Sequence, residues 1–178
     1  MKKSLALILV LAVLIWAINW IQPQKFFTTE SCPFCEGSVL EKQAVYRSDW
    51  RSDGAAALLN YKPAIPGHML IIPERHVERF EEMTAAEMSA VHALIAKVDA
   101  AEREIFGATG YILLQKNGAE AGQSVPHVHF HYYPVKQGDS KAWLAVRMFL
   151  ASWLKPLTEQ ELDRQRSHFQ NSTALKNR

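Results

Sequence analysis

The sequence predicts an α+β domain, built on an antiparallel sheet and preceded by a single transmembrane helix. Five short segments rich in β-branched and aromatic residues are bounded by turn residues. Helical periodicity is confined to one stretch before the fourth of these segments and to the C-terminal end. Strands joined by short turns, with helices set apart from them, are typical of helices packed on an antiparallel sheet.

The strands are expected at residues 43–47, 55–60, 68–72, 111–116 and 125–133. Each segment is short and is bounded by residues that favour turns. Asp53 and Gly54 separate the first two strands, and Pro63, Pro66 and Gly67 interrupt the connection to the third.

A long helix is predicted over residues 85–106. Thr84 and Glu87 form a capping box at its start, and Gly107 ends it. The apolar residues at helical spacing are Met88, Val91, Ile95, Val98 and Ile105.

Two further helices are predicted over residues 141–154 and 159–169, the second capped by Thr158 and Glu161. The first of them carries large apolar side chains and few charges. It suits packing against the domain or a dimer partner, which we prefer, or a position on a membrane surface.

The N-terminal segment is the strongest compositional feature. No charged residue lies between Lys3 and Lys25, and about 21 uncharged residues reach about 31 Å as a helix, enough to cross a bilayer. We therefore expect a membrane anchor at residues 1–24 and a linker at 25–31. Lys2 and Lys3 place the N-terminus in the cytoplasm and the domain on the extracytoplasmic side. The alternative is a cleaved signal peptide.

Composition limits the remaining possibilities. With 178 residues the chain suits one well-buried domain. The 20 basic residues barely outnumber the 18 acidic ones, which leaves no excess for a nucleic-acid groove, so we expect no nucleic-acid partner. Two cysteines are too few for a disulfide framework, and their close spacing indicates metal or redox chemistry.

The chemically informative stretch is GQSVPHVHFHYY, residues 122–133. On a strand, His127, His129 and His131 share one face, and the apolar residues between them share the other. Imidazole can act as a phosphate nucleophile or as a metal ligand. A nucleophile needs hydrogen-bond donors around the phosphate oxygens, and the segment of Gly122, Gln123 and Ser124 can supply them.

This stretch resembles the signature of the histidine-triad superfamily of nucleotide hydrolases and transferases. The segment NYKPAIPGHMLIIPERH, residues 60–76, resembles the family's ribose-side strand and turn, and NGAEAGQS, residues 117–124, resembles its phosphate loop. The resemblance covers residues 32–135 and is to the zinc-bearing bacterial type, with similarity to the fragile-histidine-triad branch. It implies a five-stranded antiparallel sheet, a histidine-triad domain over 32–138 with a helical extension over 139–178, and a homodimer.

The resemblance also implies roles for individual residues. His129 would attack the α-phosphate of a dinucleoside polyphosphate or nucleoside phosphoramidate and form a nucleotidyl-histidine. His131 and Ser124 would donate to that phosphate, and His127 completes the catalytic set. The implied substrate-binding residues are Asn60 and His68 on the ribose side and Lys116, Asn117, Gly122 and Gln123 around the phosphates. Lys116 departs from the Asn or Gln of most relatives, and Asn117 is the alternative occupant of that role.

A second group joins Cys32, Cys35, His76 and His127. Two cysteines and two histidines satisfy a closed tetrahedral zinc site, and zinc-bearing relatives look similar, so we expect a structural zinc ion. The alternative is a redox role for the Cys-x-x-Cys pair. Two other functions remain open: a catalytic zinc on the three histidines, and a membrane-anchored nucleotide sensor with little turnover.

Overall fold

The computed structural model describes residues 31–48, 53–151 and 154–176. They form the predicted α+β fold around one five-stranded sheet of strand order β1-β2-β3-β5-β4, in which all neighbours are antiparallel. The strands are β1 (Ala44–Arg47), β2 (Ala55–Leu59), β3 (Met69–Pro73), β4 (Gly110–Gln115) and β5 (Phe130–Val135). β5 pairs with both β3 and β4, so the last strand along the chain lies inside the sheet.

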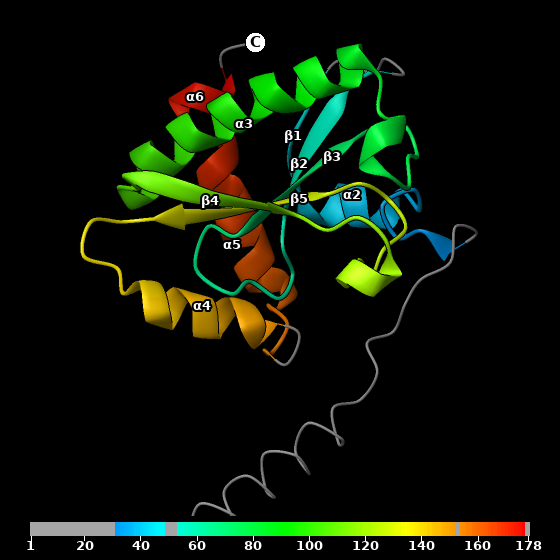
Figure 1. The fold of residues 1–178 in the computed structure, drawn as a ribbon. Coiled ribbons are helices and arrows are strands. Elements are labelled where there is room, and N and C mark those ends of the chain that lie inside the picture. Colours follow the sequence, from blue (N-terminus) through cyan, green and yellow to red (C-terminus); the bar gives the residue numbers. More distant parts are fainter. Residues whose placement is uncertain (1–30, 49–52, 152–153, 177–178) are drawn as a thin grey trace, which may run out of the picture.

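One face of the sheet is covered by α3 (Ala85–Phe106), which crosses it in Figure 1. Thr84 and Glu87 form the predicted capping box, and Gly107 ends the helix in the left-handed region with φ 67°. The main hydrophobic core lies between α3 and the sheet, and α5 (Glu159–Gln170) and α6 (Thr173–Lys176) close its edge. Its members include Ala57, Met69, Ile71, Val91, Leu94, Val98, Val128, Phe130, Tyr132, Leu162, Phe169 and Leu175.

The opposite face is covered at two separate places. Near β1 and β2, the Cys32–Phe34 loop and α2 (Ser38–Gln43) pack on Leu58, Leu70 and Ile72. Near the other end, α4 (Lys141–Phe149) packs through Leu144 on Tyr133 and Ile65. Figure 1 shows α3 and α4 on opposite sides of the sheet.

The predicted elements differ from the observed ones mainly at β5. This strand begins at Phe130 rather than at residue 125. Pro126 has no N–H to donate to a ladder, the N–H of His127 donates to the carbonyl of Val125, and that of Val128 donates to Val77. The histidine segment therefore enters the sheet through a turn. α4 ends at Phe149 rather than at residue 154, and the short helices α2 and α6 were not predicted.

The membrane part of the sequence-based prediction was wrong, both in the fold class and in the expected single-pass membrane location. None of the helices in the described ranges combines the length and the apolar character needed to cross a bilayer. The longest, α3, has 22 residues but carries charged side chains such as Lys97 and Arg103. The predicted anchor at residues 1–24 and most of the linker at 25–31 lie outside the described residues.

Candidate active site

Two of the predicted site histidines form a hydrogen-bonded pair across β3 and β5. His68 lies just before β3, and its Nε2 is 2.9 Å from Nδ1 of His131. Because the N–H of Ala64 donates to Nδ1 of His68, that ring carries its proton on Nε2 and donates it to His131. The proton of neutral His131 is then on Nε2, as a hydrogen-bond donor. Burial lowers the pKa of His68 to about 3 and that of His131 well below its usual range, so both rings are neutral at pH 7.

The neighbouring His129 is held in the opposite tautomer. Its Nδ1 is 2.7 Å from the backbone carbonyl oxygen of His127, which only accepts, so Nδ1 carries the proton and Nε2 keeps its lone pair. His129 is 5% exposed, and burial lowers its pKa. The rings of His129 and His131 lie 5.0 Å apart between centroids. One ring therefore offers a lone pair beside another that offers a proton.

His127 does not face the other two histidines as strand alternation predicts. Its Nε2 donates to the carbonyl oxygen of Pro73 at 2.9 Å, which leaves the lone pair on Nδ1. That nitrogen lies 3.6 Å from the Sγ atoms of both Cys32 and Cys35. Nδ1 of His76 lies 3.2 Å from Sγ of Cys35. His127 therefore faces the cysteine pair, and its backbone carbonyl fixes His129.

The four predicted ligands converge on one candidate metal site. One ligand atom from each of Cys32, Cys35, His76 and His127 lies within 4.8 Å of all the others. A tetrahedral zinc ion sets sulfur and nitrogen ligands roughly 3.3–3.8 Å apart, close to the sulfur–nitrogen distances here. Burial and the neighbouring Cys32 raise the pKa of the Cys35 thiol to about 11, so paired thiolates at this place require a cation. The donor set therefore fits a metal ion.

The loop of residues 32–35, which carries the two cysteines, also contacts two of the histidines directly. Phe34, between the two cysteines, is buried and packs edge-on against both His127 and His129, with ring centroids 5.6 and 5.7 Å apart. On the other side, Tyr133 stacks on His68 at 4.2 Å. Sequence reasoning missed both aromatic residues, although the position of Phe34 inside the ligand motif and of Tyr133 two residues after His131 were available signals.

The predicted phosphate loop, residues 117–124, contains side chains that are bonded within the protein and others that are partly exposed. Gln123 is buried; its Oε1 accepts from the N–H of Gly118 and its Nε2 donates to the carbonyl of Glu78. Asn117 accepts from the N–H of Phe80 and donates to Glu81. Both side chains therefore hold the loop in place through hydrogen bonds within the protein. Gly122 adopts a φ of 81° just after the short turn η3 (Ala119–Ala121), and the half-buried Ser124 follows two residues later.

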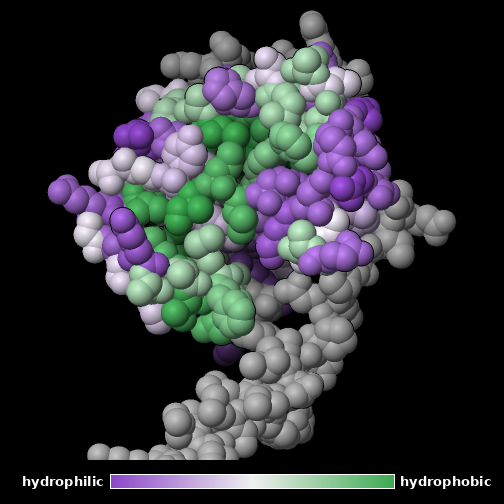
Figure 2. Space-filling view, viewed as in Figure 1, coloured by the Kyte–Doolittle hydropathy of each residue, from purple (hydrophilic) through white to green (hydrophobic). Residues whose placement is uncertain are grey.

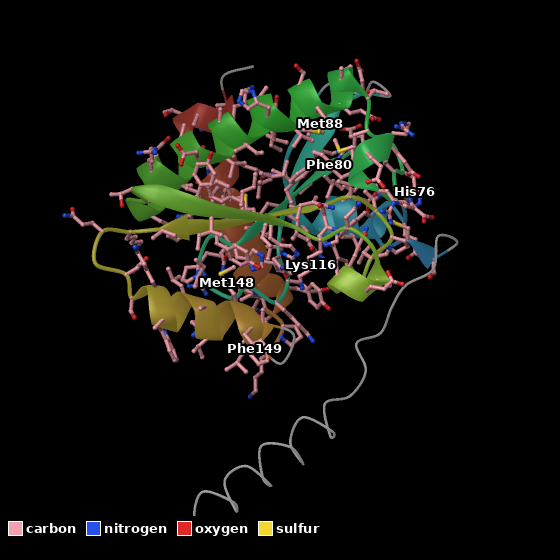
Figure 3. All side chains as sticks on the ribbon, in the orientation of Figure 1. His76, Phe80, Met88, Lys116, Met148 and Phe149 are labelled. Atoms are coloured by element: carbon pink, nitrogen blue, oxygen red, sulfur yellow. The ribbon has the colours of Figure 1, made fainter. Side chains whose placement is uncertain are left out.

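Lys116 lies at the start of this loop and near the histidines. A Cβ placed at Gly122 would lie 3.4 Å from its Nζ, and its positive charge lowers the pKa values of His129 and His131. Figure 3 shows it just past β4, between α4 and η3 in this view.

Asn60, at the end of β2, accepts from the N–H of Lys62, and its Nδ2 lies 3.3 Å from Nε2 of His68. The site thus runs across the sheet from β2 to β4.

Comparison with known proteins agrees with this geometry. Residues 39–138 match the family model described as HIT domain. The chain is 38% identical over 90 residues to the bis(5'-nucleosyl)-tetraphosphatase [asymmetrical] of Schizosaccharomyces pombe, covering 51% of this chain and 50% of that protein. It is 40% identical over 83 residues to the bifunctional bis(5'-adenosyl)-triphosphatase/adenylylsulfatase FHIT of Arabidopsis thaliana, covering 47% and 46%. The chain thus spans about half the length of these curated relatives.

Solved structures show the same fold. The NitFhit protein of C. elegans aligns with a TM-score of 0.59 at 25% identity, over 73% of this chain and 27% of that one. A Zn-bound histidine triad family protein of Mycobacterium smegmatis aligns with a TM-score of 0.58 at 24% identity, over 80% and 95%. Because the family model matches residues 39–138, more than half of the chain, this chain belongs to the HIT family.

Proposed function

We propose that this protein is a nucleotide hydrolase or nucleotidyl transferase that acts at the α-phosphate of a dinucleoside polyphosphate or a nucleoside phosphoramidate. The observation that carries this proposal is the pair of opposite tautomers at His129 and His131. Both rings are neutral because they are buried, so the nucleophile does not first have to lose a proton at pH 7.

The reaction proceeds in two steps. Nε2 of His129 attacks the α-phosphorus, a P–N bond forms, and the bond to the leaving group breaks with its electron pair going to that group. Nε2–H of His131 and the Ser124 hydroxyl donate to the phosphate oxygens, where negative charge develops. Asn60 holds the ribose. Water then attacks the phosphorus, its oxygen replaces Nε2, and the proton it releases passes to solvent; in transfer, another acceptor takes the place of water.

The candidate metal site supports this chemistry from a distance. We propose that Cys32, Cys35, His76 and His127 hold a structural zinc ion, which leaves no open position for catalysis. A bound ion would hold Nδ1 of His127, whose backbone carbonyl accepts the hydrogen bond from Nδ1–H of His129. This arrangement disfavours a catalytic zinc on the three histidines, because His127 faces the cysteines. It also disfavours a redox role for the cysteine pair, because histidine nitrogens lie beside both sulfur atoms.

We also propose a homodimer formed through β4. This strand is at the edge of the sheet and exposes Tyr111, Ile112 and Leu113. Figure 2 shows apolar surface in this part of the molecule. An exposed apolar edge strand is a template for pairing with a second strand, and a two-fold axis would join two sheets into one. We assign residues 32–138 to the histidine-triad domain and 139–178 to its extension, of which α5 completes the core.

The decisive experiment traps the intermediate. Wild-type protein is mixed with an α-labelled dinucleoside polyphosphate under single-turnover conditions, quenched in the cold, and examined by mass spectrometry for a nucleotidyl adduct on His129. His129→Ala should lower turnover by at least about 10³-fold without loss of nucleotide binding. His131→Ala removes one donor and should cost about 10²-fold. His92→Ala, an exposed histidine on α3, is the matched control and should keep full activity.

Two results would refute the mechanism. Turnover without any histidine adduct, abolished by a chelator that leaves the fold intact, would indicate a catalytic metal. Nucleotide binding without turnover of any substrate would favour a nucleotide sensor.

A further inference from the structure

Lys116 occupies a distinctive place in the site. It directly follows β4, is half-buried, and its Nζ approaches the phosphate loop at Gly122. Across the ladder, Leu114 pairs with His131 and Gln115 with Phe130. Lys116 is the residue after the last pair of this register, and its positive charge acts on both His129 and His131. A flexible ammonium group therefore lies next to the ring that carries the nucleophilic lone pair.

The charge of Lys116 has no counterion within the described structure. The ion pairs between described residues join other side chains, and none includes Lys116. The neighbouring His129 and His131 rings are neutral and cannot balance it. A half-buried cation without a carboxylate partner favours an anionic ligand, because a charge-assisted contact compensates for the water it has lost.

The sheet order indicates which part of a substrate Lys116 meets. Asn60 and His68 lie at β2 and β3, His129 and His131 enter or lie on β5, and Lys116 follows β4 on the far side of β5. A nucleotide with its ribose at Asn60 and its α-phosphate at His129 directs the rest of its phosphate chain toward β4. Lys116 therefore faces the group that leaves and not the nucleoside that stays.

We propose that Lys116 selects substrates by the charge of the leaving group. It favours leaving groups with several negative charges, such as nucleoside polyphosphates, over an amine. This inference rests on the proposed function, because it assumes attack at the α-phosphate by His129. In that step the P–O bond breaks, and its electron pair goes to the bridging oxygen of the leaving polyphosphate. Lys116 keeps its protons and neutralises the charge that accumulates there.

The test compares substrates that share the adenylyl group and differ in the leaving group. Release of AMP is measured from diadenosine tetraphosphate and from adenosine 5′-phosphoramidate. Lys116→Gln, which removes the charge at similar length, should lower kcat/KM for the tetraphosphate about 10- to 100-fold. It should leave kcat/KM for the phosphoramidate within about 3-fold. Lys116→Arg should retain most activity toward both. Lys141→Gln, at an exposed lysine that begins α4, is the matched control.

Calorimetric binding of inorganic tripolyphosphate provides a readout that does not need turnover. Its affinity should fall about 10-fold or more in Lys116→Gln and stay unchanged in Lys141→Gln. Equal losses on both substrates, or tripolyphosphate affinity equal to wild type, overturn the role of Lys116. If wild-type protein releases AMP from neither substrate, the proposed function fails, whereas the tripolyphosphate measurement still decides whether Lys116 binds a phosphate chain.

Discussion

The buried carboxyl group of Glu102 makes the stability of this protein depend on pH in an unusual direction. Glu102 is on α3, is 0% exposed, and neither side-chain oxygen has a hydrogen-bond partner among the described residues. It packs against Gly67, where a Cβ atom would lie 2.5 Å from Oε2. Burial raises its pKa to about 9, although the charge of Lys136 acts in the opposite direction. The folded protein therefore carries a neutral carboxylic acid at pH 7.

The magnitude follows from proton linkage. Glu102 has its ordinary pKa near 4.5 in the unfolded chain and about 9 in the fold, so folding takes up a proton between these values. The stabilising contribution is fully present below pH 4.5 and is lost as pH rises, by up to about 1.4 kcal/mol per pH unit. From pH 5.5 to 8.5 the loss approaches about 4 kcal/mol as an upper limit. Glu102→Gln keeps the shape without the titration and should escape this loss.

Urea unfolding of wild type and Glu102→Gln at several pH values between 5.5 and 8.5 measures the effect. The variant should be close to wild type at pH 5.5 and clearly more stable at pH 8.5. Glu104→Gln, an exposed acid on the same helix, is the control and should gain no stability at high pH, since hydrogen bonds from Thr173 lower the pKa of Glu104. A stability difference between Glu102→Gln and wild type that stays constant across the range would refute the reasoning.

Three further predictions concern the candidate metal site, the contact between Phe34 and His129, and the dimer. Cys32→Ala should lose zinc by metal analysis and unfold at a lower temperature, because metal binding is coupled to folding; an unchanged melting temperature would favour the redox alternative. Phe34→Leu should retain zinc but lower kcat about 10-fold with little change in KM, because His129 loses its edge contact; unchanged kcat would show that the contact is incidental. Ile112→Lys should give a monomer in light scattering, whereas the same change at exposed Ala93 on α3 should not.

Local signals in the sequence were sufficient for most helices and strands. The capping box of Thr84 and Glu87 and the stop at Gly107 lie within a turn of the helix ends they determine, so α3 is observed at its predicted bounds. β5 was predicted five residues too early, because its apolar alternation continues through the turn that contains Pro126. The alternation assigns the apolar face correctly, since Val128, Phe130 and Tyr132 all enter the core under α3, but it wrongly groups His127 with His129 and His131.

The candidate site was only partly predictable. Residue types alone indicated the four candidate metal ligands, which the fold brings together, because cysteine and histidine at such spacing have few other uses. The hydrogen bonds of Gln123 and Asn117 to Glu78, Phe80 and Glu81 were not predictable, because these three partners lie more than 30 positions away in the sequence. A polar side chain in a phosphate-type loop looks the same in sequence whether it binds substrate or supports the loop.

The sequence by itself determined the α+β class, the family resemblance, and the chemistry available at His129, His131 and the candidate metal ligands, because these depend on side-chain type and on short sequence patterns. The tertiary structure alone decided how that chemistry is arranged. The Ala64 N–H and the His127 carbonyl set opposite tautomers on adjacent rings, and the pairing of β4 with β5 brings Lys116 beside them. A proton's position on imidazole is fixed by the atoms around it, and chain folding is what supplies those atoms.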